Sequence, residues 1–424
     1  MNSNTALILK EEYGISDKLI EIADRAEEKC GEYLKRADDI AGYNGLKVLK
    51  SFKKHKISAE HLASTTGYGY DDIGRDTLDK VYADTFGAED AIVRHSFVNG
   101  THTIATSLFA VLRPGDTLVA ATGKPYDTLE EVIGIRPSKG SLREIGVNYR
   151  QVDLVDSGMD FDGLRDAIDS TCRVVAIQRS KGYAWRDSLS VDKIGEIIDF
   201  VKSIRKDIIC VVDNCYGEFA EIIEPTDVGA DMIVGSLIKN PGGGLAQSGG
   251  YIAGTKECID LASYAYSCPG IGRECGSTLG NNSLMYQGFF MAPHIVAQSI
   301  KASVFCSALM EEMGYDVLPR YNAKRTDIIS AIRLNSPDKL IRFCQGIQSG
   351  APIDSFVLPM PWDMPGYENQ VIMAAGAFTQ GSSIEISADG PLKEPYIAYF
   401  QGGLTYESAK VAILSGANNI LEVR

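Results

Sequence analysis

Residues 208–244, IICVVDNCYGEFAEIIEPTDVGADMIVGSLIKNPGGG, carry the strongest indication of the fold. It contains two short apolar runs, Ile208–Val212 and Met232–Val234, each of a length typical of a buried strand. Asp213 closes the first run, and Lys239 follows the second just before a turn rich in proline and glycine. Short apolar strands of this kind are typical of a parallel sheet covered on both faces.

The pattern continues on both sides of this stretch. Helices are predicted from about Gly100 to just before Arg113, and from Val191 to Arg205. We therefore expect an α/β fold with a mostly parallel, mixed sheet. The other strand candidates are Ala91–Arg94, Thr117–Ala121, Val174–Gln178 and Tyr251–Ala253.

Three regions are predicted along the chain. Residues 1–60 are charged and have helical periodicity, with Ser16 as a cap, and form an N-terminal helical arm. Residues 61–293 form the large α/β domain, and residues 294–424 form a connecting helix and a smaller C-terminal α+β domain. The elements expected after the connecting helix are strands at Tyr315–Leu318, Ser355–Leu358 and Ser383–Ile386, and helices around Arg325–Arg333 and Thr405–Leu414.

Composition excludes several classes of function. The net charge of −14 repels phosphate backbones, so we expect no nucleic-acid partner. The longest apolar runs are short, so no membrane-spanning helix is expected, and the first ten residues do not resemble a secretory signal. We expect a cytoplasmic protein. The nine cysteines are scattered and the five histidines form no ligand motif, so no metal site is predicted.

The common phosphate and nucleophile motifs do not occur. The sequence has no G-x-x-x-x-G-K-S/T, its glycines at 67, 69 and 74 lack G-x-G-x-x-G spacing, and there is no G-x-S-x-G. Nothing in the motifs therefore supports ATP hydrolysis, Rossmann-type hydride transfer or α/β-hydrolase chemistry.

Asp213 and Lys239 instead indicate a pyridoxal phosphate site. Both follow strand candidates, and open α/β sheets bind ligands at the carboxyl ends of their strands. Pyridoxal phosphate needs a lysine for its aldehyde and a carboxylate to keep its pyridine nitrogen protonated. Taken singly, each residue also fits an ordinary role, an aspartate that caps a helix and a solvated lysine.

Several segments together resemble the aluminium-resistance protein family, which is similar to the pyridoxal-phosphate-dependent cystathionine lyases. The resemblance covers nearly the whole chain and implies a fold-type-I enzyme. It is carried by 211–219 (VVDNCYGEF), 233–254 with Ser236 to Gly244 (SLIKNPGGG), 66–78 (TGYGYDDIGRDTL) and 399–406 (YFQGGLTY).

The resemblance implies roles for individual residues. Lys239 is similar to the lysine that bonds the cofactor aldehyde, Asp213 to the partner of the pyridine nitrogen, and Ser236 to a serine that binds the phosphate. Asn99, Gly100 and Thr101 begin a helix placed like the family's phosphate cradle, and free N–H groups at a helix start favour a dianion. An ordinary tight turn remains the alternative there.

Further residues are implied around the cofactor. Tyr126 is placed like the aromatic ring that stacks on the pyridine, and Gln178 like a contact to its phenolic oxygen. Tyr68, Tyr70 and Arg75 resemble residues lent to the cofactor phosphate of a neighbouring subunit. The alternatives are a half-buried tyrosine, a polar strand end and a Gly/Tyr-rich loop with a surface ion pair.

The sequence departs from the lyases at two positions. Ile238 stands before Lys239 where they have a threonine, and Glu385 stands where a substrate-binding arginine is expected. Arg273 is our candidate for the missing arginine.

The predicted function is cleavage of a carbon–sulfur bond in cystathionine, cysteine or methionine, by α,β- or α,γ-elimination, with Lys239 as base and Tyr126 as acid. A homodimer or homotetramer that shares its sites between subunits is expected. The alternatives are an aminotransferase or other pyridoxal phosphate chemistry, and a non-catalytic metal-tolerance protein.

Overall fold

The computed structural model describes residues 3–155, 158–364 and 367–421. Contacts divide these residues into two units. The large unit comprises Asn44–Gly182 and Ser188–Met291, and the C-terminal unit comprises the other described residues, including Tyr183–Asp187. The division into three regions at residues 60 and 293 stays a prediction.

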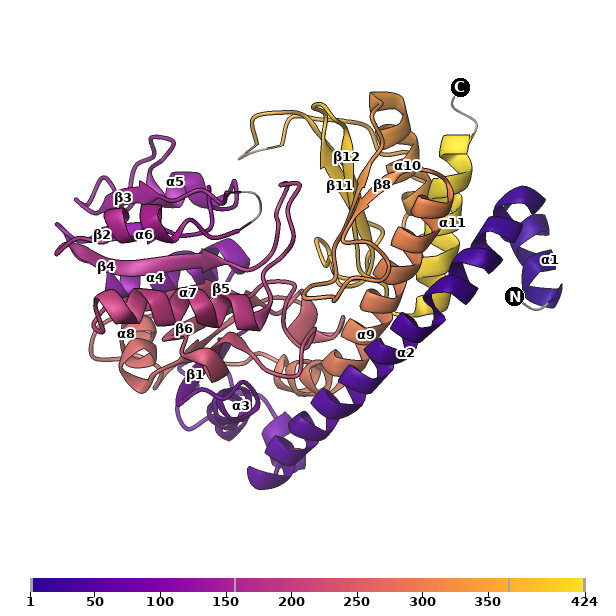
Figure 1. Ribbon diagram of the computed structural model, residues 1–424. Coiled ribbons are helices and arrows are strands. Elements are labelled where there is room, and N and C mark those ends of the chain that lie inside the picture. Colours follow the sequence, from indigo (N-terminus) through magenta and orange to yellow (C-terminus); the bar gives the residue numbers. More distant parts are fainter. Residues whose placement is uncertain (1–2, 156–157, 365–366, 422–424) are drawn as a thin grey trace. The chain divides into compact units, whose positions relative to one another are not determined.

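The large unit is built on a seven-stranded sheet of order β1-β7-β6-β5-β4-β2-β3 (Figure 1). The strands from β6 to β3 in this order are parallel, whereas β7 runs antiparallel to both β6 and β1, so the sheet is mixed as predicted. The strands are β1 (Asp90–Arg94), β2 (Thr117–Ala120), β3 (Asn148–Gln151), β4 (Cys172–Gln178), β5 (Ile209–Asp213), β6 (Met232–Ser236) and β7 (Gly250–Gly254).

Six of these strands were predicted within one or two residues, and β3 was missed. It has the sequence Asn-Tyr-Arg-Gln and lies at the edge of the sheet, where half-exposed polar residues are tolerated. This strand therefore lacks the run of apolar residues by which the other six were predicted.

Helices connect and cover these strands. The predicted helix after Asn99 is α4 (Gly100–Val111), which the Asn99 side chain caps by accepting from His102 N at 2.8 Å. The predicted helix after Ser190 is α7 (Val191–Ile204). The other helical segments of this unit are η1 (Ala59–Leu62), α3 (Ile73–Thr85), α5 (Leu129–Ile133), α6 (Phe161–Ala167), η2 (Pro225–Val228), η3 (Asn240–Gly242) and α8 (Lys256–Tyr266).

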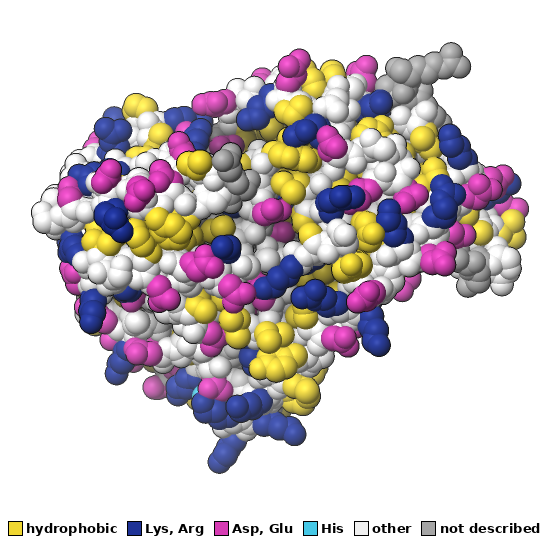
Figure 2. Space-filling model, in the orientation of Figure 1, with side chains coloured by type: hydrophobic (Ala, Val, Ile, Leu, Met, Phe, Trp, Pro, Cys, Tyr) yellow, Lys and Arg dark blue, Asp and Glu magenta, His cyan; other side chains and the backbone are white. Residues whose placement is uncertain are grey.

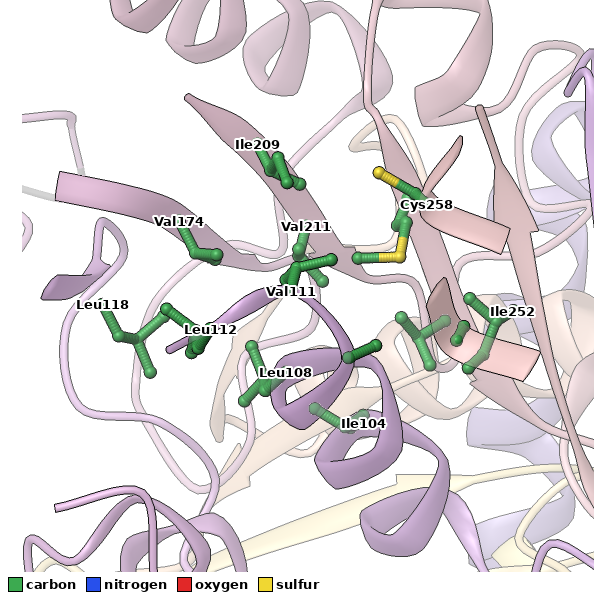
Figure 3. Packing of buried hydrophobic residues seen from close by; sticks show 14 of the residues in the cluster. Ile104, Leu108, Val111, Leu112, Leu118, Val174, Ile209, Val211, Ile252 and Cys258 are labelled. Carbon is green, nitrogen blue, oxygen red and sulfur yellow. The ribbon is translucent and has the colours of Figure 1, made fainter. Parts of the chain in front are cut away.

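A buried apolar cluster fixes α4 on the sheet. Figure 3 shows Ile104, Leu108 and Val111 of α4 beside the strand residues Val211 and Ile252. Burying each such side chain contributes about 1.5–3 kcal/mol. The packing therefore holds the start of α4 in a defined position at the edge of the sheet.

Strand register brings polar side chains to one edge of the sheet. Gln178 at the end of β4 pairs with Asp213 at the end of β5, and Asp213 pairs with Val234 of β6. Ser236 ends β6, and Lys239 follows it. The carboxyl ends of β4, β5 and β6 thus carry the groups that the sequence singled out.

The C-terminal unit contains a five-stranded antiparallel sheet of order β10-β11-β12-β9-β8. The helix α11 (Tyr406–Leu421) packs against α10 (Pro337–Ser349). The strands are β8 (Asp316–Leu318), β9 (Ser330–Arg333), β10 (Val371–Ala374), β11 (Ser387–Pro391) and β12 (Ile397–Gln401). The helix α1 (Ser3–Glu11) belongs to this unit, while α2 (Asp17–Lys54) and α9 (Asn282–Glu312) contribute residues to both units.

Three predictions in this unit are wrong. Ser355 and Phe356 form a turn, residues 357–358 have no regular structure, and the side chains of Phe356, Val357 and Leu358 are exposed, so their apolar character does not mark a buried strand. Ser383–Ile386 is also a turn, and the strand begins at Ser387. The segment predicted as a helix around Arg325–Arg333 ends in β9, which lies between β12 and β8 and is buried by them.

The helix α9 corrects the expectation that no segment is apolar enough to cross a membrane. The helix is long and apolar enough to cross a membrane, but 78% of its most apolar 18-residue stretch is buried inside the protein. It begins at Asn282 rather than near His294 as predicted, and continues through Pro293. Its apolar character is that of a core helix.

Candidate cofactor site

A cavity of about 610 Å³ lies at the carboxyl edge of the large-unit sheet. It brings together seven of the predicted site residues: Asn99, Gly100, Thr101, Tyr126, Asp213, Ser236 and Lys239. The rest of its wall is formed by Ile104, Thr128, Leu129, Ser180, Cys215, Tyr216 and Ile238.

The backbone after β6 places Lys239 in this cavity. Lys239 N donates to Ser236 O at 3.3 Å, and the short helix η3 follows at once. A Cβ placed on Gly242 would lie 1.6 Å from the backbone oxygen of Leu237, so only glycine fits this turn. The lysine Nζ lies 4.2 Å from the centre of the Tyr216 ring.

Neighbouring groups control the charge of Lys239. Burial by itself lowers the pKa of Lys239, but the attraction of acidic groups around it, Asp213 among them, outweighs burial, and the pKa is raised. Burial also raises the pKa of Cys215 well above that of a free thiol. The thiol is therefore neutral at physiological pH, and the free lysine is an ammonium ion.

Asp213 is held at the end of β5 by its own turn. Its Oδ1 accepts from Cys215 N at 3.1 Å. The side chain lines both this cavity and a second, mainly apolar cavity of about 470 Å³ beside it. A carboxylate between an open and an apolar space is suited to stabilise a buried cation.

The start of α4 and the end of β6 together form a site that fits a phosphate dianion. Ser236 is buried, and its Oγ has no hydrogen-bond partner in the described part of the chain. A Cβ placed on Gly100 would lie 3.4 Å from the Ser236 Cβ, so the two residues face each other closely. Thr101 Oγ1 and Thr128 Oγ1 are 2.7 Å apart beside them. Free N–H groups at the helix start, its dipole and these hydroxyl groups all favour an anion.

Tyr126 and Gln178 lie close to each other at this edge. A Cβ placed on Gly182 would be 3.7 Å from Tyr126 Cδ2 and 3.3 Å from Gln178 Nε2. Tyr126 lines the main cavity, but Gln178 lines the adjoining apolar one and donates to Ser180 O at 3.2 Å. Gln178 thus lines a cavity that shares Asp213 with the main one, and its contact with the cofactor stays a prediction.

Tyr68, Tyr70 and Arg75 do not line the cavity. The rings of Tyr68 and Tyr70 are stacked, with centres 5.6 Å apart, and both are exposed. Arg75 is buried, and its NH1 donates to Gly69 O at 2.6 Å and to Gly276 O at 2.9 Å. Arg75 thus fixes the loop that carries the two tyrosines, and its guanidinium does not point outward as a phosphate ligand would.

Arg273 also lies away from Lys239. Its guanidinium donates to Asp90 at 2.9 Å and to Asp260 at 2.8 Å, in a separate polar cavity that Asp76 and Asp79 also line. In the C-terminal unit, Glu385 accepts from Phe378 N and Thr379 N and is buried. Glu385, which stands where a substrate-binding arginine was expected, therefore holds the loop at Phe378 and Thr379 in place.

Sequence reasoning missed several residues of the cavity wall. Cys215 and Tyr216 lie within the segment 211–219 that carried the family resemblance, so their place after Asp213 could have been used to find them. Thr128 and Ser180 had no such signal, because they come from loops that only the folded chain brings to the sheet edge.

The chain matches the family model for methionine gamma-lyase over residues 19–421. It is 52% identical over 391 residues to the uncharacterized protein YnbB of Bacillus subtilis, covering 92% of this chain and 93% of YnbB. Two crystal structures of proteins involved in aluminum resistance are similar to this chain over almost its whole length. A carbon-sulfur lyase from Clostridium novyi has a TM-score of 0.95 and 52% identity, and covers 99% of this chain and all of its own. A protein from Clostridium acetobutylicum has a TM-score of 0.96 and 50% identity with the same coverage.

More distant structures show the fold alone. The pyridoxal-5'-phosphate-dependent protein YhfS of Escherichia coli is 16% identical, with a TM-score of 0.61 over 90% of this chain and 96% of its own. The architecture is that of fold-type-I pyridoxal phosphate enzymes, and the chain belongs to the methionine gamma-lyase family, among its aluminium-resistance members.

Proposed function

We propose that this protein is a pyridoxal-phosphate-dependent lyase that breaks a carbon–sulfur bond in cystathionine, cysteine or methionine by α,β- or α,γ-elimination. The observation that carries the proposal is a single cavity containing Lys239, Asp213 and the hydroxyl of buried Ser236, which has no partner among the residues that the structure describes. The similar structure from Clostridium novyi is that of a carbon-sulfur lyase, which supports the same reaction.

Pyridoxal phosphate, when bound, would supply an aldehyde that bonds the amines of lysine and substrate and a ring that accepts electrons. Ser236 Oγ, Thr101 Oγ1 and the first N–H groups of α4 would bind its phosphate. The Asp213 carboxylate would hold a proton on the ring nitrogen. Tyr126 offers an aromatic surface beside that ring.

Lys239 Nζ is the base of the proposed reaction. In its neutral form it takes the proton from the substrate α-carbon. In α,β-elimination the carbon–sulfur bond at the β-carbon then breaks. In α,γ-elimination a proton must also leave the β-carbon before the bond at the γ-carbon breaks. In both cases the electron pair of that bond leaves on sulfur, and the Tyr126 hydroxyl gives the thiolate a proton. Ile238 provides an apolar wall at the position of the threonine hydroxyl in the related lyases.

A cytoplasmic homodimer or homotetramer is part of the proposal. Tyr68 and Tyr70 are exposed as a stacked pair on a loop fixed by Arg75, which suits a contribution to the site of a second copy. A surface dedicated to binding metal ions has less support, because Figure 2 shows acidic side chains scattered among basic ones.

A product assay tests the reaction class. The purified protein with pyridoxal phosphate is incubated with cystathionine, cysteine and methionine, and thiol and keto acid are measured separately. Release of both in equal amounts, lost in Lys239→Ala, is expected. Keto acid without thiol would replace the lyase by an aminotransferase, and no product from any of the three would remove these substrates from the proposal.

A further inference from the structure

Glu218 is a fully buried carboxyl group close to Lys239 that the proposed reaction leaves unused. It lies in the turn after β5, five residues beyond Asp213, and has no solvent-exposed surface. Its Oε1 accepts from the Tyr251 hydroxyl at 3.0 Å. Its Oε2 has no hydrogen-bond partner among the residues that the structure describes. A buried polar atom without a partner is costly, so its retention needs a reason.

The surrounding backbone is shaped to hold this side chain. Tyr216 and Phe219 have positive φ angles of 72° and 61°, which are unfavourable for residues with a Cβ. A Cβ placed on Gly235 would lie 2.3 Å from Glu218 Oε1, so only glycine leaves room for the carboxyl group. Strain of this kind persists only where the rest of the structure enforces it.

Glu218 is also tied to the residue that follows Lys239. The Asn240 side chain donates to Glu218 O at 2.9 Å. Gly235, which leaves room for the carboxyl group, and Asn240 thus hold Glu218 against both ends of the segment that carries Lys239. Lys239 is the cation that favours the ionised form of Glu218. The nearby Arg179 is already bound to Asn214 at 2.7 Å and to Glu221 at 2.9 Å.

The remaining neighbours keep Glu218 largely protonated. Burial, followed by repulsion from Glu224, raises the pKa of Glu218 to about 8, although the Tyr251 hydrogen bond and Lys239 oppose the shift. The group therefore changes charge just above neutral pH. The titratable groups that interact with it are Tyr82, Cys215, Glu224, Lys239 and Tyr251.

We infer that Glu218 is a positioning residue that sets the proton affinity of Lys239 Nζ. When ionised it stabilises a proton on that nitrogen, and when neutral it releases the lysine to act as a base. The inference rests on the proposed function, in which Lys239 must both hold and give up a proton.

The test is the pH dependence of the visible spectrum of the protein with bound pyridoxal phosphate, which reports whether the Lys239 nitrogen is protonated. Glu218→Gln removes the negative charge and should lower the midpoint of the colour change by about one pH unit, a ten-fold loss of proton affinity. Tyr251→Phe removes the donor that favours the ionised form, and should shift the midpoint in the same direction by less.

Glu221→Gln is the matched control. Glu221 is a buried carboxylate bound to Arg179 and to Val191 N at 2.8 Å, and its substitution should leave the midpoint unchanged. If Glu218→Gln fails to fold, Tyr251→Phe decides in its place. A wild-type midpoint in the folded variant overturns the inference alone, whereas a wild-type protein without any visible band overturns the inference and the proposed function together.

Discussion

Gly100 and Ser236 face each other at the phosphate end of the cavity, so closely that a Cβ on Gly100 would lie 3.4 Å from the Ser236 Cβ. One residue begins α4 and the other ends β6. A helix start and a strand end thus converge on one small site, and the serine hydroxyl between them is buried without a partner among the described residues. This pairing leads to the first prediction.

Ser236→Ala should weaken pyridoxal phosphate binding by about 10- to 150-fold without destabilising the fold. A hydrogen bond to a charged group is worth about 1.5–3 kcal/mol net, and the hydroxyl makes no bond in the described structure that the substitution would break. Cofactor titration followed by absorbance measures the change. Ser107→Ala, which removes a buried hydroxyl bound to Ile104 O, serves as control and should retain affinity. Equal affinities of Ser236→Ala and wild type would contradict the assignment.

Gly242→Ala should abolish cofactor binding, because the new Cβ would collide with Leu237 O and displace the turn that carries Lys239. Gly31→Ala is the control, since a Cβ there meets nothing within 4 Å and α2 gains about 0.5–1 kcal/mol of helix propensity. Both variants are compared by absorbance after reconstitution. Normal binding by Gly242→Ala would show that the turn is less constrained than its geometry indicates.

Arg75→Ala should destabilise the loop bearing Tyr68 and Tyr70. The substitution removes the donors to Gly69 O and Gly276 O and leaves buried carbonyl groups unpaired, at a cost of about 2–4 kcal/mol. Urea unfolding measures the loss, and gel filtration measures the effect on assembly. If stability stayed the same and only cofactor affinity fell, Arg75 would instead be a phosphate ligand, as the family resemblance implies.

Asp389 should make the protein less stable as the pH rises through neutrality. Burial raises the pKa of Asp389 to about 7, so between about pH 4 and 7 the folded state holds a proton that the unfolded state has lost. Asp389→Asn removes this dependence. The variant should be more stable than wild type by about 4 kcal/mol at pH 8, and the difference should vanish near pH 4. Denaturant unfolding at the two pH values tests this, and an unchanged difference between them would exclude the Asp389 titration as its cause.

The large unit could be predicted well because its strands are short apolar runs with breakers between them, as in Ile209–Asp213. The C-terminal unit could not. β11 reads Ser-Ala-Asp-Gly-Pro, a composition typical of a turn, yet it is buried between β10 and β12. Pairing on both sides overrode local propensity there, which no single stretch of sequence reveals.

The residues of the site likewise fall into those that local sequence predicts and those that depend on contacts between distant parts of the chain. Asp213 and Lys239 were found because they follow predicted strands, and Ser236 was found through the family resemblance. Gln178 ends a neighbouring strand and donates to Ser180 O, and its contact with the cofactor stays a prediction. Glu218 was missed because its importance arises from burial and from Tyr251, which is distant in sequence.

The visible spectrum of the purified protein, recorded beside that of Lys239→Ala before and after borohydride, shows directly whether Lys239 binds pyridoxal phosphate. We expect a yellow band in the wild type that borohydride bleaches and the variant lacks. A colourless wild-type protein that added pyridoxal phosphate cannot colour would rule out the cofactor and its lysine.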